Sequence, residues 1–271
     1  MAQSSIIPRI GFGTYRLKDQ QVIDSVKSAL ELGYRHIDTA QVYDNEQPVG
    51  EGIRQSGVPR DEIFLTTKVW WDRFRHDDLI ASLEESCRKL GVDRLDLALI
   101  HWPSPDDEVP MAEYIGALDA AREKGLTRHI GVSNFTMAHL DEAVSVPGGE
   151  HLITNQIEVH PFLANRRLVA HSQARGLEVT GYMPLAVGKV MNEPVLQQIA
   201  DDHDATPAQI ALAWVAAQGI AVIPSSTKPE HQRANLAALE LTLSEDDMAR
   251  IEHLDVGERI ANPDFAPRWD T

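Results

Sequence analysis

Three apolar, β-like runs of this sequence each end in a side chain that can exchange a proton or carry a charge. The residues at these ends are Asp38, Lys68 and His101. A tyrosine, Tyr43, follows the first run by five residues and falls in the loop after it. A phenol, an amine, a carboxylate and an imidazole brought together would form a group suited to proton transfer.

The chemistry of this group depends on how acidic Tyr43 is. A free tyrosine has a pKa of about 10, which makes it a weak acid at neutral pH. We expect the Lys68 ammonium to stabilise the phenolate and lower that pKa, and Asp38 to keep Lys68 charged and oriented. His101 can hydrogen-bond a reacting oxygen. Such a group can protonate an oxyanion that forms on a carbonyl carbon, but it supplies no electrons, so a bound hydride donor is required.

The elements that must position these residues alternate between strand and helix along the whole chain. Hydrophobic periodicity and turn signals predict eight strands, at 8–15, around 36–38, and at 63–68, 95–100, 128–132, 152–157, 177–182 and 219–224. Helices are predicted between them, at 19–33, 46–56, 78–90, 111–124, 137–146, 166–175, in a region containing 206–217, from about 229, and after a cap at 244–247.

This alternation predicts a parallel sheet with helical crossovers. The repeat and the length of 271 residues fit a closed (β/α)8 TIM barrel of about 250 residues, whose active sites lie at the C-terminal ends of the strands. No linker or change of composition divides the chain. We therefore expect one α/β domain over residues 1–271.

Composition excludes several other classes of protein. The formal net charge is −16, which argues against binding to a nucleic-acid backbone. No stretch has the roughly 18 apolar residues of a membrane helix, and no signal peptide is recognisable. Cys87, the one cysteine, lies in register with an apolar helix face and is expected to be buried. Gly11 and Gly13 lack the rest of a Rossmann motif, and no zinc motif is present. We expect a cytoplasmic protein without a metal or a membrane partner.

Several motifs in this order resemble those of the aldo-keto reductase family over essentially the whole chain. They also resemble the short bacterial 2,5-diketo-D-gluconate reductases within that family, which reduce small carbonyls such as methylglyoxal. The matching segments are Gly11–Thr14, Gly33–Ala40 with Tyr43, Thr67–Lys68, Leu99–Pro103, Gly131–Phe135, Asn155–Gln156 and Asn262–Trp269.

The resemblance implies a role for each matching residue. Asp38, Tyr43, Lys68 and His101 would be the catalytic tetrad, with Tyr43 as the general acid. The nicotinamide would be held by three polar side chains and stacked on an aromatic ring, here Ser133, Asn134, Gln156 and Tyr182. The substrate pocket would contain His101 and three further aromatic residues, Tyr15, Trp70 and Trp102. No role is assigned to Trp71.

The adenosine end of the cofactor is expected on the loops after the seventh and eighth strands. By resemblance, its contacts are Leu185, Gly188, Ser225, Ser226, Thr227, Lys228, His231 and Asn235. Ser225 stands where the family commonly has a lysine, and His231 where it commonly has an arginine. NADPH is still the predicted cofactor. Its 2′-phosphate would bind Lys228, with Arg233 or His231 as alternatives.

The leading hypothesis is thus an NADPH-dependent reductase of small polar aldehydes and ketones, acting as a monomer. A nucleotide-binding regulatory protein of the same fold is the alternative, and turnover would separate the two. A metal-assisted hydrolase using Asp38 and His101 is a third hypothesis, opposed by the lack of a ligand cluster. The short loop after the fourth strand and the short C-terminal tail predict an open, wet pocket.

Overall fold

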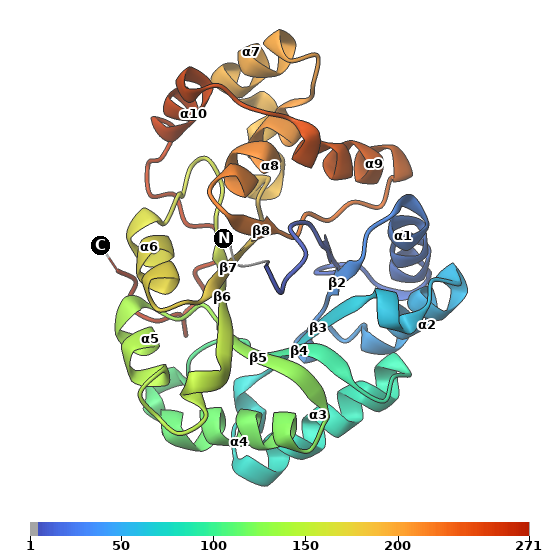
Figure 1. Ribbon diagram of the computed structural model, residues 1–271, viewed down its shortest axis with the longest axis vertical. Helices are drawn as coiled ribbons and strands as arrows, with labels where there is room; N and C mark the ends of the chain where they lie inside the picture. The colour runs from blue at the N-terminus through green and yellow to red at the C-terminus, as the bar shows by residue number, and fades with distance from the viewer. Residues whose placement is uncertain (1–4, 271) are drawn as a thin grey trace.

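The computed structural model describes residues 5–270, and eight parallel strands form its centre (Figure 1). Each strand pairs with the next one along the chain, in the order β1 to β8. The first and last strands meet through a bridge between Ile10 and Val222, where the Gly11 amide donates to the Val222 carbonyl at 2.8 Å. The strands are β1 (Phe12–Gly13), β2 (His36–Asp38), β3 (Phe64–Val69), β4 (Leu95–Ile100), β5 (Thr127–Ser133), β6 (Leu152–Glu158), β7 (Glu178–Tyr182) and β8 (Ile220–Val222).

Helices surround the strands, so the predicted (β/α)8 barrel is confirmed (Figure 1). They are α1 (Asp19–Leu32), α2 (Glu46–Ser56), α3 (His76–Leu90), α4 (Met111–Glu123), α5 (Met137–Ala143), α6 (Arg166–Ala174), α7 (Pro194–Asp202), α8 (Pro207–Ala217), α9 (Pro229–Ala237) and α10 (Glu245–Glu252). Within residues 5–270, no helix combines the length and the apolar character needed to cross a membrane.

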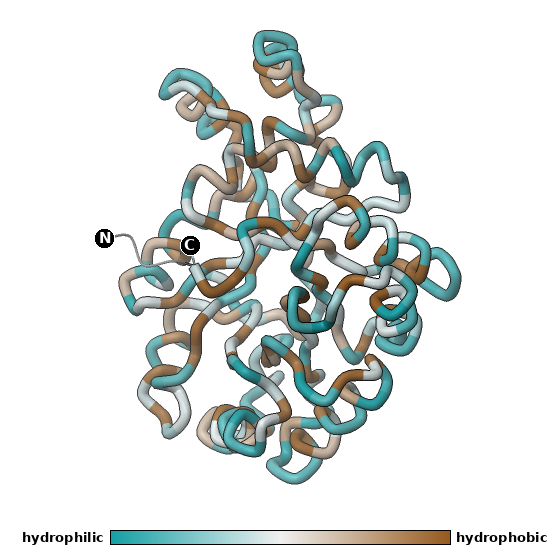
Figure 2. The backbone as a smooth tube through the Cα atoms, turned by 45° about the vertical axis from the view of Figure 1, so that its right-hand side comes forward, coloured by the Kyte–Doolittle hydropathy of each residue, from teal (hydrophilic) through white to brown (hydrophobic). Residues whose placement is uncertain are grey.

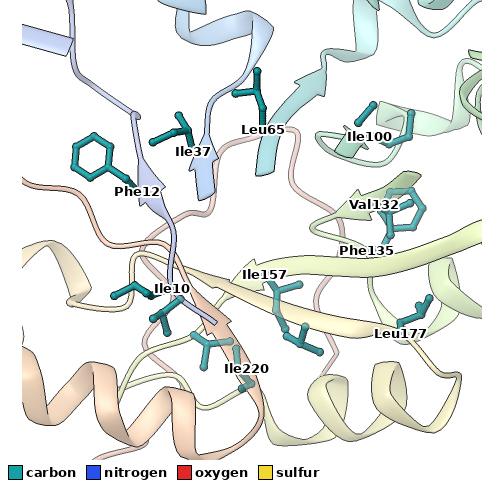
Figure 3. Close-up of a cluster of buried hydrophobic side chains, with 14 of the residues drawn as sticks. Ile10, Phe12, Ile37, Leu65, Ile100, Val132, Phe135, Ile157, Leu177 and Ile220 are labelled. Carbon is teal, nitrogen blue, oxygen red and sulfur yellow. The ribbon is translucent and has the colours of Figure 1, made fainter. Parts of the chain in front are cut away.

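The alternation of side chains along the strands creates two separate hydrophobic clusters. Residues such as Ile37 and Leu65 point outward and pack under the helices, in the main core drawn in Figure 3. A smaller cluster that includes Ile7, Leu97 and Leu99 is separate from that core. Figure 2 shows the resulting pattern on the helices, with hydrophilic residues on their outer faces. The inward-pointing strand residues outside this smaller cluster are polar, and they form the candidate functional site.

The predicted helix ends match the structure closely. Gly33 adopts a left-handed φ of 111° and ends α1 with backbone hydrogen bonds back into the last turn; such a conformation favours glycine. Capping boxes begin α8 at Thr206 and α10 at Ser244, as their sequences predict. Cys87 is buried on α3.

The strand β8 and the helix α5 are each three residues shorter than predicted, and two other elements differ more. The first strand shrinks from residues 8–15 to Phe12–Gly13 plus the bridge at Ile10. It is squeezed against the end of β8, where a Cβ added to Gly13 would lie 2.8 Å from the Ile223 carbonyl oxygen. The region before β8 holds two helices, α7 and α8, and the sequence prediction resolved only the second of them.

Candidate active site

The four residues proposed for proton transfer meet at one cavity of about 1010 Å³. Asp38, Tyr43 and His101 line it directly, and Lys68 lies just behind them. This volume lies at the upper end of the usual range for small-molecule sites. A groove of about 1150 Å³ between α1, α2 and α3 contains none of the four, so we place the chemistry in the first cavity.

The floor of the cavity is a buried ion pair. Lys68 Nζ lies 2.5 Å from Asp38 Oδ1, and the two side chains are 1% and 2% exposed. Lys68 also donates to the Thr39 carbonyl at 2.8 Å, while Gln156 Nε2 donates to Asp38 Oδ2 at 2.8 Å. Burial lowers the pKa of Lys68, and the pairing with Asp38 opposes that shift. Residues of β2, β3 and β6 thus hold this ion pair in place.

Tyr43 lies over this ion pair, with its hydroxyl 3.5 Å from Lys68 Nζ. Burial raises the pKa of Tyr43 well above its ordinary value, and the charges of Asp38 and Tyr15 add to the increase. The expectation of a net lowering of this pKa is therefore wrong, because burial raises it by more than the nearby Lys68 ammonium can lower it. Asp38 lies 2.5 Å from Lys68 Nζ, closer than the Tyr43 hydroxyl at 3.5 Å, and its charge opposes that of Lys68. The phenol consequently keeps its proton throughout the neutral pH range.

His101 stands beside Tyr43, with ring centroids 5.6 Å apart. Burial lowers the pKa of His101 well below its ordinary value, and the charge of Lys68 acts in the same direction. The imidazole is therefore neutral at pH 7, so one ring nitrogen donates and the other accepts. Its Nδ1 is buried without a hydrogen-bond partner among the described residues. A neutral ring that faces the cavity can donate to a ligand oxygen.

Amide and hydroxyl groups form the next part of the lining. The Asn134 side chain donates to the His101 carbonyl at 3.0 Å and accepts from the Tyr182 hydroxyl at 2.7 Å. Asn134 itself has a φ of 63°, which turns the chain sharply after β5. Ser133 Oγ donates to the Gln156 carbonyl at 2.8 Å. Ser133, Asn134, Gln156 and Tyr182 therefore form one connected polar surface at the cavity.

The opposite wall is aromatic. Phe265 packs against the rings of Trp70, Trp71 and Trp102, with centroids 5.7, 4.1 and 5.4 Å away. Trp71, which has no role assigned from the sequence, therefore supports this wall through its contact with Phe265. Tyr15 is 47% exposed and packs on Tyr43, with ring centroids 5.1 Å apart.

The C-terminal segment, residues 255–270, supplies wall residues that sequence reasoning did not assign to the site. Its cavity-lining residues lie about 160 positions after Trp102, and no periodic pattern links the two regions. The residues of this segment that line the cavity are Ile260, Ala261, Asn262, Pro263 and Phe265.

The residues proposed for the adenosine end divide into two groups. Leu185, Gly188 and Ser225 line the cavity. The others lie beyond it, along the loop after β8 and on α9, and they are Ser226, Thr227, Lys228, His231 and Asn235. Buried Gln232 holds this loop in place, since its Nε2 donates to the Ser226 carbonyl at 2.8 Å and to the Ser25 carbonyl at 3.1 Å. No motif or periodic pattern in the sequence singles out Gln232.

The chain belongs to the Aldo/keto reductase family, whose pattern matches residues 9–256. Members of this family are oxidoreductases that act on carbonyl groups and use nicotinamide cofactors. The residues present here fit such a cofactor, because an aromatic ring, two amides and a hydroxyl share one surface beside the neutral His101 ring.

Individual relatives agree with the family assignment. The chain is 52% identical over 265 residues to methylglyoxal reductase DkgB of Escherichia coli O157:H7, covering 97% of this chain and 99% of the relative. It is 53% identical, with the same coverage, to methylglyoxal reductase DkgB of Yersinia pestis. A crystal structure provisionally named as a 2,5-diketo-D-gluconic acid reductase B superposes with a TM-score of 0.92 at 43% identity, covering 98% of this chain and 94% of the other.

Proposed function

We propose that this protein reduces small polar aldehydes and ketones with NADPH, and that Tyr43 is the general acid. The observation that carries the proposal is the meeting of Tyr43, the Lys68–Asp38 pair and neutral His101 at the floor of one cavity. A bound nicotinamide would supply the hydride, which none of these side chains can provide.

Tyr43 would act in its protonated form. Its raised pKa keeps the proton in place until negative charge develops on the carbonyl oxygen, when transfer becomes favourable. The Lys68 ammonium, 3.5 Å from the hydroxyl, would then stabilise the phenolate that remains. Asp38 and Gln156 would act through Lys68 by holding it in position.

His101 would orient the carbonyl before the proton moves. A neutral imidazole can donate a hydrogen bond to the carbonyl oxygen without competing as an acid. The ring is held edge-on between Tyr43 and Trp70, with the Trp70 centroid 5.1 Å away. This packing limits its rotation and therefore the orientations open to a substrate.

Polar side chains beside Tyr182 would hold the nicotinamide. Ser133, Asn134 and Gln156 offer hydroxyl and amide groups at the cavity, and the half-buried Tyr182 ring faces the same space. The hydrogen bond from the Tyr182 hydroxyl to Asn134 fixes the ring relative to the amide.

Local charge supports a phosphate-bearing cofactor in a protein whose formal net charge is −16. Arg16 and Lys18 line the cavity, whose only carboxylate among the described residues, Asp38, is already paired. Lys228 and Arg233 are exposed, and neither pairs with a carboxylate within residues 5–270. Lys228 immediately precedes α9, whose N-terminus favours anions. These cations support NADPH, with Lys228 as the contact of the 2′-phosphate.

The names of the relatives point to small oxygen-rich substrates, and the aromatic wall fits them. Trp70, Trp102 and Phe265 provide apolar contact, whereas His101 and Tyr43 provide the polar contacts. We infer that methylglyoxal and keto-sugar acids are within the substrate range, and that the protein acts as a cytoplasmic monomer.

The test is NADPH oxidation measured with methylglyoxal, 2,5-diketo-D-gluconate and a series of larger aldehydes. Tyr43→Phe should lower kcat at least about 100-fold, the scale expected for loss of a general acid. Its affinity for NADPH should stay within about twofold of wild type, because the hydroxyl bonds to none of the proposed cofactor contacts. A variant that keeps more than a tenth of wild-type kcat would remove Tyr43 from the mechanism. Tight NADPH binding without turnover of any carbonyl would favour a regulatory role instead.

A further inference from the structure

A fully buried carboxylate that has no part in the proposed chemistry lies next to the cavity. Glu158 is the last residue of β6 and is 0% exposed. Its Oε1 accepts from the Ile260 amide at 2.7 Å, and its Oε2 accepts from the Ala261 amide at 2.8 Å. His160 Nε2 lies 2.9 Å from Oε1. One carboxylate therefore binds two successive amides of the C-terminal segment.

The two amides belong to the part of this segment that faces the cavity. Ile260 and Ala261 line it, and they lead directly to Asn262, Pro263 and Phe265 in the same wall. Phe265 in turn packs on Trp102. The position of this wall therefore depends on where Ile260 and Ala261 are held.

Other contacts tie the segment to the barrel further from the cavity. The Glu258 amide donates to the Phe162 carbonyl at 2.9 Å. Arg259 lies over the Trp269 ring at 3.6 Å and donates to Asn165 at 3.1 Å. At the far end, the Met137 amide donates to Asp270 at 2.9 Å. None of these contacts involves a backbone amide of the cavity-lining residues.

We propose that Glu158 is a positioning residue that sets the substrate-binding wall, and through it the size of substrate that this enzyme selects. The proposal rests on the proposed carbonyl reduction. Within the described residues, the carboxylate of Glu158 hydrogen-bonds His160 and the Ile260 and Ala261 amides, and no member of the tetrad or of the proposed nicotinamide contacts; Tyr182 is its neighbour only as the register partner on β7. Its influence should therefore appear in KM, and for substrates large enough to reach the wall.

Replacing Glu158 by glutamine tests the carboxylate with almost no change of volume. Two acceptor oxygens face the Ile260 and Ala261 amides, and glutamine offers one oxygen and one NH2 group. Whichever way the amide is turned, one backbone N–H then faces another donor. Losing a charge-assisted hydrogen bond shifts an order–disorder equilibrium roughly ten- to a hundred-fold.

A matched control exists at the opposite end of the barrel. Glu178, at the start of β7, accepts from the Ile6 amide at 2.7 Å and from the Ile7 amide at 3.2 Å. It thus binds two successive backbone amides of a terminal segment, as Glu158 does, but it does not line the cavity. Glu178→Gln reproduces the chemical change without disturbing the proposed wall.

The first experiment compares steady-state kinetics of both variants. Glu158→Gln should raise KM for 2,5-diketo-D-gluconate about tenfold, since the wall position is loosened by about that factor or more. KM for methylglyoxal should change less than threefold, because a three-carbon substrate can bind at Tyr43 and His101 alone. The kcat values and NADPH affinity should stay within threefold, and Glu178→Gln should match wild type. Equal KM changes for both substrates, or for both variants, would overturn the proposal.

The second experiment measures the hydrogen bonds from the Ile260 and Ala261 amides to Glu158, and it requires no turnover. Amide hydrogen exchange should be slow at Ile260 and Ala261 in wild type and in Glu178→Gln, and at least tenfold faster in Glu158→Gln. Persistent protection in Glu158→Gln would overturn the proposal even if the kinetics agreed. Absence of carbonyl turnover in wild type would instead count against the proposed function alone. Should Glu158→Gln fail to fold, Ala261→Pro removes one of the two donors from the half-exposed segment, and unchanged kinetics there would refute the idea.

Discussion

Removing the buried cation of the candidate active site should lower both stability and activity, and the two losses can be measured separately. In Lys68→Met, Asp38 stays 2% exposed but loses the ammonium 2.5 Å away. Its remaining side-chain partner within the described residues is Gln156, at 2.8 Å. Breaking a buried ion pair by deleting one partner typically destabilises a protein by about 3–5 kcal/mol. We expect the free energy of unfolding of Lys68→Met to fall by that amount.

The double variant Asp38→Asn/Lys68→Met should recover most of this loss, because no uncompensated charge remains buried. Its activity should not recover, since the ammonium that we propose to stabilise the phenolate of Tyr43 is still absent. In Lys68→Met alone, the unpaired Asp38 charge should raise the pKa of Tyr43 further, and the acid of the pH–rate profile should move upward.

Urea unfolding at pH 7 measures the first effect, provided that the m value stays constant across the variants. Steady-state reduction of methylglyoxal measures the second. A Lys68→Met protein destabilised by less than about 1 kcal/mol, the range of exposed pairs, would show that the pair is not effectively buried. A double variant no more stable than Lys68→Met would refute the electrostatic explanation of the loss.

Three further perturbations test other parts of the structure. Lys228→Ala should weaken NADPH binding roughly ten- to a hundred-fold, the scale of a charge-assisted phosphate contact, and leave NADH almost unchanged; calorimetric titration with both cofactors would reveal equal losses if the phosphate binds elsewhere. Burial lowers the pKa of His36 to about 4. His36 therefore binds a proton near pH 6.5 in the unfolded chain but only near pH 4 in the folded protein, so the free energy of unfolding should fall by about 3 kcal/mol from pH 7 to pH 4. In His36→Gln, urea unfolding should show a correspondingly smaller fall of this free energy. Gly50→Ala places a Cβ 2.3 Å from the Leu90 carbonyl oxygen and should lower the melting temperature through about 1–3 kcal/mol of overpacking, whereas Gly116→Ala on α4, with open space around it, should raise it.

The parts of the site that depend on strand ends could be predicted from the sequence. A strand with a polar residue at its C-terminal end delivers that residue to one face of a parallel barrel, so Asp38, Lys68 and His101 meet as expected. The existence of the helices followed from their apolar periodicity and glycine ends. The sequence predicts a single helical region before β8, around the strong start signal at Thr206, and so does not separate α7 from α8.

Features that depend on distant contacts could not be predicted in this way. The meeting of Trp71 with Phe265 joins positions 194 residues apart, and no local pattern encodes it. The pKa of Tyr43 depends on burial and on whether Asp38 or Tyr43 lies nearer to Lys68, and both depend on the folded structure. In the sequence, Glu158 looks like an ordinary residue at the end of a strand. Only the structure shows that backbone amides of the C-terminal segment bind its carboxylate.

The aromatic wall gives the protein an optical reporter of its own. The chain has five tryptophans. One of them, Trp214, is buried on the apolar face of α8. The other four, Trp70, Trp71, Trp102 and Trp269, are linked by ring contacts around the cavity. Four of the five tryptophans therefore lie in or next to the aromatic wall of the cavity. Ligand entry and displacement of the C-terminal segment should both change the tryptophan fluorescence of the unlabelled protein, whereas the contribution of Trp214 should stay constant.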